Sequence, residues 1–224
     1  MAQKLGQPES LDVLFRDALV LIVNKPAGIA VHAGTGPGAH LGPLLAGLRF
    51  GLPNPPELAH RLDRDTAGCL VLGRHRQALK RLGTLFAQGR VDKVYCAVVE
   101  GGPVDDDGHI DMPLARLVRD GRGRTGPSPD GKPAQTEWRV LGRGGGRCWL
   151  ACRPLTGRTH QIRAHLAESG WPIVGDPVYG RAGGGLHLFA QSVSIPLYGD
   201  KKPPVAATAP VPPHMVEVLT TLGL

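Results

Sequence analysis

Apolar residues along the chain form short runs separated by glycine and proline, a pattern typical of short strands joined by turns. Runs of this kind predict strands at residues 12–16, 18–23, 68–73, 92–100, 134–141, 147–153 and 205–211. The segment Gly-Arg-Gly-Gly-Gly at 142–146 lies between two of these runs and predicts a hairpin turn.

A helical period replaces this pattern in four other segments. In residues 75–88, basic residues lie opposite a face formed by Leu79, Leu82, Leu85 and Phe86. The further segments that predict helices are residues 39–49, 158–169 and 212–222. Residues 1–10 predict a loose tail, and residues 119–131, RDGRGRTGPSPDG, predict a flexible basic loop.

Strands and helices follow one another without regular βαβ alternation, which predicts an α+β fold with a mixed, mainly antiparallel sheet. The 224 residues are enough to bury a core. No internal repeat and no linker divides the pattern. We therefore expect one domain over residues 11–224.

The charge balance favours a polyanionic partner. Lys and Arg number 26 against 19 acids, giving a net charge of +7, and nucleic acid is the leading candidate. A basic surface without a partner is the alternative. The four cysteines lie in apolar runs without a C-x-x-C pair, which favours free thiols in a reducing cytoplasm over a zinc site. The N-terminus lacks the apolar core of a secretory signal.

Motifs for other classes of ligand are weak. Residues 126–132 begin like a phosphate-binding loop, but Pro133 stands where that loop has Ser or Thr. No H-E-x-x-H segment supports a catalytic metal. Residues 26–48 carry no acid, Lys or Arg, yet their glycines and prolines argue against a membrane span. We therefore expect no metal, no nucleotide cofactor and no membrane association.

Three segments carry candidate chemistry. The first, HRLDRDTAG at 60–68, holds an acid between arginines, where it stays ionised and can act as a nucleophile or a base. The second is Tyr95, within a predicted strand. The third, LTGRTHQIRAH at 155–165, opens a predicted helix with backbone N–H groups and a cation that can face an anion. Taken singly, each segment also fits a structural role: a loop of paired charges, a packed aromatic and a capped helix.

Together and in this order, HRLDRDTAG, DKVYCAVVEG and LTGRTHQIRAH resemble the RluA-type family of RNA pseudouridine synthases. LIVNKPAGIAVH, GKPAQTEW and IVGDPVYG resemble the same family, and the similarity runs from about residue 11 to about residue 215. It departs from the family at Ala67, where Ser or Thr is usual, and at Ala164, where Val is common. The resemblance implies a catalytic domain whose sheet is flanked by helices and long loops around a central cleft. It also implies an isomerase that needs no cofactor.

The resemblance also assigns roles to residues. It implies that Asp63 is the essential carboxylate, that Arg163 pairs with it, and that Tyr95 lies against the target base. The residues by themselves do not choose between Asp63 and Asp65. The side chains expected to contact RNA are Arg61, Arg64, Arg158, His160 and Lys132. Arg61 is expected to stack in the gap left by a flipped base. His60 receives no role beyond loop structure.

The function expected from the sequence is therefore isomerisation of uridine to pseudouridine in structured RNA, by a monomer in the cytoplasm. Ribosomal RNA is favoured over transfer RNA. One alternative is a catalytically silent RNA-binding or ribosome-assembly protein on the same fold. A glycosidase using Asp63 and Asp65 is disfavoured, because residues two apart on an extended loop point to opposite sides.

Overall fold

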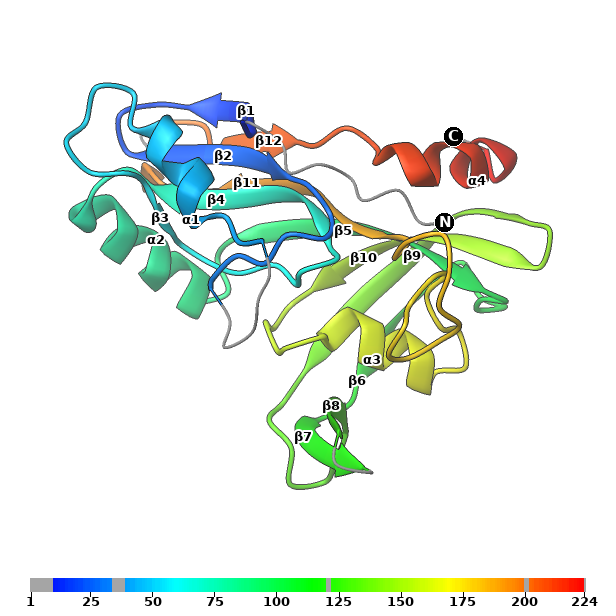
Figure 1. Cartoon of the computed structure of the whole chain (residues 1–224). Coiled ribbons are helices and arrows are strands. Elements are labelled where there is room, and N and C mark those ends of the chain that lie inside the picture. Colours follow the sequence, from blue (N-terminus) through cyan, green and yellow to red (C-terminus); the bar gives the residue numbers. More distant parts are fainter. Residues whose placement is uncertain (1–9, 34–38, 120–121, 200–201, 224) are drawn as a thin grey trace. The chain divides into compact units, whose positions relative to one another are not determined.

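A computed structural model of the chain describes residues 10–33, 39–119, 122–199 and 202–223 (Figure 1). Short helices and many strands confirm the predicted α+β fold. All but the last residue of the predicted tail at 1–10 lies outside the described residues.

The chain forms two compact units. The first unit takes the chain up to Arg90 and then Ser194–Ala209, and the second takes Val91–Val193 and Pro210–Leu224. One strand, β11 (Leu188–Ile195), begins in the second unit and ends in the first.

The first unit is an antiparallel sheet with a helix packed on it. Its elements are β1 (Asp12–Arg16), β2 (Val20–Lys25), α1 (Gly42–Leu45), the 3-10 helix η1 (Ala46–Leu48), β3 (Glu57–Leu58), β4 (Ala67–Gly73), α2 (Arg76–Ala87) and β12 (Val205–Thr208). Strand β2 pairs with β1 and β4, and β3 pairs with β4. Because β4 is buried along its whole length, it forms the centre of this unit's core.

Helix α2 packs against β4 at a glycine. A Cβ atom on Gly73 would lie 2.9 Å from the backbone of Leu79, so only glycine permits this approach. The predicted amphipathic face is confirmed, with Leu82 and Leu85 buried beside Ala78. The helix begins after His75, whose ring Nδ1 accepts a hydrogen bond from the Ala78 amide.

The second unit contains antiparallel strands in the order β5-β10-β9-β6. Its elements are β5 (Asp92–Glu100), β6 (Asp107–Asp111), β7 (Leu114–Arg119), β8 (Arg122–Pro127), β9 (Gln135–Gly144), β10 (Arg147–Pro154), α3 (Gln161–Glu168) and α4 (Pro213–Thr221). The predicted hairpin at 142–146 is confirmed. Its turn is Gly145-Gly146, with φ values of +56° and +72°, which glycine adopts without strain.

Two sequence-based predictions for the second unit are wrong in detail. The predicted flexible loop at 119–131 is largely ordered, because β8 pairs with β7 in a separate two-stranded sheet. The predicted helix at 158–169 begins only at Gln161, because His160 has a left-handed φ of +53°. The Gln161 side chain accepts a hydrogen bond from the Arg158 amide, so this amide already has a partner within the chain.

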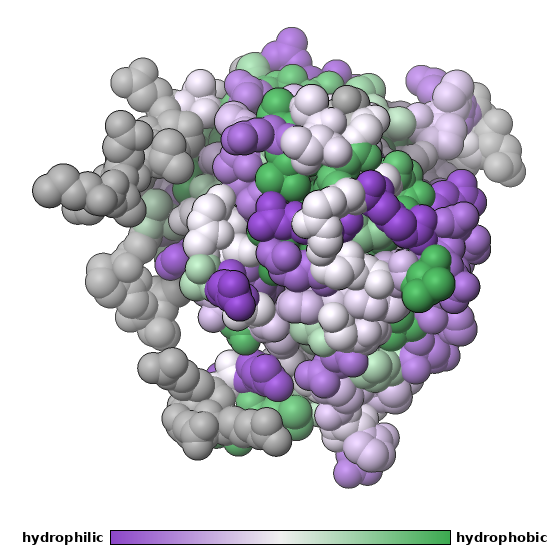
Figure 2. Space-filling model, turned by 90° about the vertical axis from the view of Figure 1, so that its right-hand side faces the viewer, coloured by the Kyte–Doolittle hydropathy of each residue, from purple (hydrophilic) through white to green (hydrophobic). Residues whose placement is uncertain are grey.

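The surface mixes polar and apolar residues. Figure 2 shows hydrophilic residues over most of the visible face and hydrophobic residues in small groups. Across the described part of the chain, no helix has the length and apolar character needed to span a membrane.

Candidate functional site

Asp63 lies in a tight turn of the first unit, between β3 and β4. The Thr66 amide donates to the Asp63 carbonyl at 3.2 Å and closes the turn. Leu62 and Thr66 are buried on either side, whereas the Asp63 side chain is half-buried. The turn therefore holds a carboxylate at the edge of a packed core.

A buried lysine supports this turn from the end of β2. The side chain of Lys25 is fully buried, and its ammonium donates to the carbonyls of Pro26, Ile29 and Arg64 at 2.8, 2.9 and 2.9 Å. Lysine carries three donors, so each one has an acceptor. The segment after β2 and the Asp63 turn are thus fastened to the same side chain.

A second donor reaches the same carbonyl. The Gly28 amide donates to the Arg64 carbonyl at 2.9 Å, and Gly28 has a φ of +85° that suits glycine. Together with Lys25, it gives the Arg64 carbonyl two hydrogen bonds. Hydrogen bonds from the Lys25-Pro-Ala-Gly28 segment therefore fix the backbone beside Asp63.

The Lys25 ammonium is costly to bury. Burial lowers the pKa of Lys25 to about 8, and the carboxylates of Asp65 and Asp63 oppose that shift. The charged form is still favoured at neutral pH. Lys25 therefore places a positive charge behind the Asp63 turn.

His60 anchors the start of the same loop. Its Nε2 accepts a hydrogen bond from the Val71 amide at 3.0 Å, so Nε2 carries no proton and the neutral ring is protonated at Nδ1. The ring also stacks on Phe86 of α2, with centroids 4.7 Å apart. His60, which received no role from the sequence, joins the loop to both β4 and α2.

The two arginines of the loop are exposed. Arg64 forms an ion pair with Asp65 at 3.3 Å, but the arginine side chain is 68% exposed, so the pair adds little stability. Arg61 precedes the buried Leu62 and its side chain lies at the surface. Both positions suit contacts with a ligand in solution.

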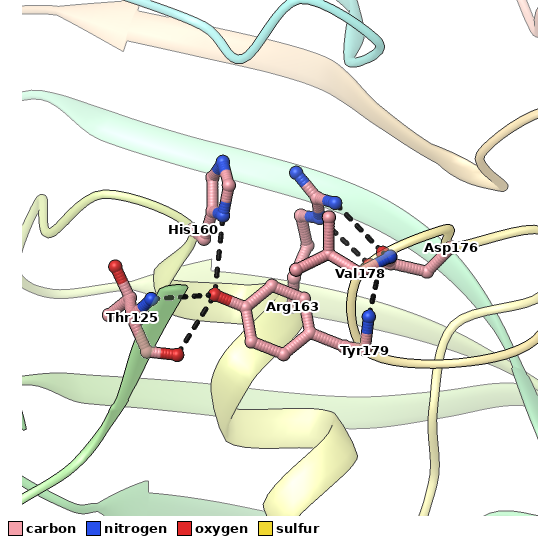
Figure 3. Close-up of polar contacts among 6 residues, drawn as sticks. All are labelled: Thr125, His160, Arg163, Asp176, Val178 and Tyr179. Atoms are coloured by element: carbon pink, nitrogen blue, oxygen red, sulfur yellow. Dashed lines mark hydrogen bonds and ion pairs between the residues drawn. The ribbon is translucent and has the colours of Figure 1, made fainter. Parts of the chain in front are cut away.

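Arg163 lies in the second unit and is buried in an ion pair with Asp176. Two parallel hydrogen bonds of 2.8 Å join its Nε and Nη2 to the two carboxylate oxygens, and the side chains are 4% and 0% exposed. The amides of Val178 and Tyr179 also donate to Asp176 (Figure 3). Burial alone would raise the pKa of Asp176, but these donors hold it below its ordinary value.

A buried polar network orients the helix that carries Arg163. The side-chain Nε2 of Gln161 donates to the Gln135 carbonyl and to the Thr136 hydroxyl, at 2.8 and 3.0 Å. His165 contacts the same hydroxyl through Nδ1 and the Met112 carbonyl through Nε2, both at 3.0 Å. Since a carbonyl only accepts, Nε2 carries the proton of His165. Burial lowers the pKa of His165, which keeps the ring neutral.

The remaining predicted residues lie on several elements of the second unit. Tyr95 is half-buried on β5, opposite Cys152 of β10, and packs against the core cluster that includes Ile162. The Arg158 Nε donates to the Pro133 carbonyl at 3.0 Å, and the neighbouring Lys132 is exposed. His160 Nδ1 lies 3.2 Å from the Tyr179 hydroxyl.

The structure thus gathers the predicted residues into two groups. Arg61, Asp63 and Arg64 share one turn of the first unit, and His160 and Arg163 share the start of α3 in the second. The pairing of Asp63 with Arg163 stays a prediction. Within the described residues, no group of His, Cys, Asp and Glu side chains could hold a metal ion.

Sequence reasoning missed three residues that shape these groups: Lys25, Asp176 and Tyr179. Lys25 follows an apolar strand and precedes Pro-Ala-Gly, and Asp176 and Tyr179 lie in GDPVYG. A lone charge at the end of an apolar run was the available signal for Lys25. No comparable signal reveals that Asp176 and Arg163 pair, because 12 residues separate them in the chain.

Known proteins of one family are similar to this chain. Residues 19–168 match the family described as RNA pseudouridylate synthase. An uncharacterized RNA pseudouridine synthase of Zymomonas mobilis is 43% identical over 217 residues, which cover 94% of this chain and 96% of that protein. A ribosomal large subunit pseudouridine synthase D of Xanthomonas campestris is 36% identical over 236 residues, covering 95% of this chain and 69% of that protein.

The chain belongs to the RluA-type family of RNA pseudouridine synthases. As a member it is an isomerase that acts on RNA. The solved structure of human RNA pseudouridylate synthase domain containing 4 shares its fold with a TM-score of 0.78 and 25% identity, covering 94% of this chain and 92% of that one. The family confirms the resemblance seen in the sequence motifs.

The Lys25 contacts of this pseudouridine synthase predict a loss of stability on substitution. Lys25→Met should lower the free energy of unfolding by about 3 kcal/mol, because the ammonium's hydrogen bonds to the carbonyls of Pro26, Ile29 and Arg64 are lost and the Arg64 carbonyl keeps only the Gly28 amide. Lys202→Met, which changes an exposed lysine of the same unit, should have little effect. Urea unfolding at pH 7 measures the difference. Equal midpoints for wild type and Lys25→Met would contradict the supporting role of Lys25.

The Asp176 contacts also predict a loss of stability on substitution. Asp176→Asn should cost about 3 kcal/mol at neutral pH, because it removes the carboxylate that compensates a buried guanidinium. The exposed Asp130→Asn serves as the matched control. Since the folded pKa of Asp176 lies below the ordinary 3.8, the advantage of the wild type is full above that pH and shrinks as the pH falls through the folded pKa. Denaturant titrations at pH 7 and in acid measure the difference in unfolding free energy between wild type and Asp176→Asn. A difference that does not change with pH would contradict the pairing.

Proposed function

We propose that this enzyme converts uridine to pseudouridine in ribosomal RNA, with Asp63 as the catalytic carboxylate. The main support for this proposal is the way the Asp63 turn is held. The fully buried Lys25 and the left-handed Gly28 both donate hydrogen bonds to its backbone at Arg64. A surface loop of paired charges needs no such support. A carboxylate that must meet a substrate in one orientation does.

The reaction is an isomerisation whose atoms balance without a co-reactant. The bond from N1 of uracil to C1′ of ribose breaks, the base turns, and a bond forms from C5 to C1′. C5 then loses its proton and N1 gains one. An ionised carboxylate serves whether Asp63 attacks the sugar, attacks the base or removes a sugar proton.

Arg163 is proposed to pair with Asp63 and keep it charged, as the family resemblance implies. Its bidentate contact with Asp176 supports this role, because it holds the guanidinium in one fixed orientation. Tyr95 is proposed to lie against the target base, where its ring can stack on the uracil. Both residues lie in the second unit, on α3 and β5.

Contacts with RNA are proposed for five basic or polar residues: Arg61, Arg64, Arg158, His160 and Lys132. The target uridine has to leave its stack to reach an active-site carboxylate, and the exposed Arg61 is proposed to fill the gap it leaves. The net charge of +7 supports binding to phosphates, which weakens as salt is raised.

Ribosomal RNA is proposed as the substrate over transfer RNA. Support comes from the Xanthomonas relative, whose name states a role on the large ribosomal subunit. The four cysteines are free and buried, which supports a reducing compartment such as the cytoplasm. A catalytically silent RNA-binding protein is the alternative, and the first experiment below separates the two.

Substitution of the carboxylates tests the catalytic assignment. Asp63→Asn should abolish tritium release from RNA labelled at C5 of uridine, while RNA binding survives, because only the charged oxygen is lost. Asp65→Asn is the matched control two residues away and should retain most activity. Full tritium release by Asp63→Asn would overturn the role of Asp63. A wild-type protein that binds this RNA but releases no tritium would favour the silent alternative.

Pseudouridine mapping tests the substrate. Total RNA from cells with and without the gene is compared at each uridine, and complementation with Asp63→Asn separates catalysis from binding. We expect one or more sites in ribosomal RNA to disappear without the gene and to stay absent with the variant. Loss confined to transfer RNA would contradict the proposed substrate.

A further inference from the structure

The hydroxyl of Tyr179 joins the hairpin β7–β8 to the start of α3. Figure 3 shows it pointing at both Thr125 and His160, while the backbone amide of Tyr179 points at Asp176. The Thr125 amide lies 3.1 Å from the hydroxyl oxygen, the Thr125 carbonyl 2.9 Å, and His160 Nδ1 3.2 Å. One side chain thus contacts two separate segments of the second unit.

The protons of this contact can be counted. A phenol donates one hydrogen bond and accepts two, and the Thr125 carbonyl can only accept, so the hydroxyl donates to that carbonyl. It accepts from the Thr125 amide, and His160 Nδ1 must then be a donor. Burial raises the pKa of Tyr179, so the hydroxyl keeps the proton it donates. All three hydrogen-bonding positions of the hydroxyl are occupied.

Thr125 lies on the outer edge of the hairpin. Strand β8 pairs with β7 along its other edge, so the outward N–H and C=O groups of β8 need partners elsewhere. The Tyr179 hydroxyl supplies both a donor and an acceptor to Thr125 and stands in for a third strand there. An isolated two-stranded hairpin is marginally stable in water, so its orientation depends on such contacts.

The other polar attachments of the hairpin are weaker or lie at its base, while β8 also packs against α3 with Thr125 and Gly126 buried. Hydrogen bonds between Leu114 and Lys132 fix the base. Arg124 reaches Glu168 of α3 at 3.6 Å, but the two side chains are 35% and 33% exposed, so this ion pair adds little. The hydroxyl of Tyr179 is therefore the main polar attachment of the described part of β8 to α3.

The hairpin is basic, and Tyr179 also contacts the proposed active-site arginine. The sequence of β7 and β8 contains Arg116, Arg119, Arg122 and Arg124. The guanidinium carbons of Arg163 and Arg124 lie over the Tyr179 ring, 5.3 and 5.7 Å from its centroid. Tyr179 thus joins a basic hairpin to the helix that holds Arg163.

We propose that Tyr179 is a positioning residue that latches the basic hairpin against α3, so that Arg116 and Arg124 are oriented before RNA binds. The inference rests on the proposed function, because it takes the ligand of the hairpin to be RNA phosphate. Without the latch, RNA binding itself has to order the hairpin, which weakens binding. Arg163 stays fixed by Asp176, so the chemical step is spared.

Tyr179→Phe tests the latch, because it removes the hydroxyl and keeps the ring and the backbone amide on Asp176. Tyr198→Phe is the matched control, since it removes a hydroxyl that donates to Asp17 at 2.6 Å in the first unit. The exchange rate of the Thr125 amide should rise about tenfold in Tyr179→Phe and stay unchanged in the control. An unchanged Thr125 rate in Tyr179→Phe would overturn the latch.

Kinetics separate positioning from a general loss of structure. With a transcript of large-subunit ribosomal RNA, Tyr179→Phe should raise KM about tenfold and leave kcat within about twofold. A variant that is merely less well folded would show a lower kcat at an unchanged KM, and that result would overturn the proposal. If the wild type makes no pseudouridine, the proposed function fails, while the exchange comparison still decides whether Tyr179 holds the hairpin.

Discussion

Burial of positive charge is the constraint on which both groups of candidate residues depend. A buried cation is tolerated only where acceptors meet its protons, so the chain around it has to adopt one arrangement. Lys25 meets three backbone carbonyls, and Arg163 meets a carboxylate. Lys25 thereby joins its own segment to the distant Arg64, and Arg163 joins α3 to the loop that contains Asp176. The charge therefore fixes local geometry as well as local potential.

The two cations are neutralised in different ways, with different consequences. Burial lowers the pKa of Lys25 to about 8, and the carboxylates of Asp65 and Asp63 offset that shift only in part. The charge of Arg163 is compensated by the full negative charge of the Asp176 carboxylate. The pKa of Asp176 lies below its ordinary value as a result. The lysine arrangement fastens backbone and suits support of a turn. The arginine arrangement fixes the direction of a planar group and suits presentation of that group to a second partner.

Local pattern predicted most elements but not the contacts between them. Strand β5 and helix α2 follow directly from their apolar spacing, because packing agrees with local preference there. Strands β6 and β8 carry glycine and charge rather than alternating apolar residues, and they form through pairing with β9 and β7. The start of α3 was also missed, because a left-handed His160 and the Gln161 side chain decide it. For the same reason, no local signal indicated that Asp176 meets Arg163 or that Tyr179 meets Thr125.

The crowded charges of HRLDRDTAG can now be understood as separate tasks on one short loop. His60 works through its ring and Arg64 through its backbone carbonyl, so both contribute to holding the turn. The guanidinium groups of Arg61 and Arg64 are exposed at the surface, where that of Arg64 also pairs with Asp65. Asp63 combines a half-buried carboxylate with a backbone carbonyl that accepts the Thr66 amide in the turn. Under the proposed function, the loop is basic and acidic at once because support, substrate contact and chemistry place different demands on adjacent residues.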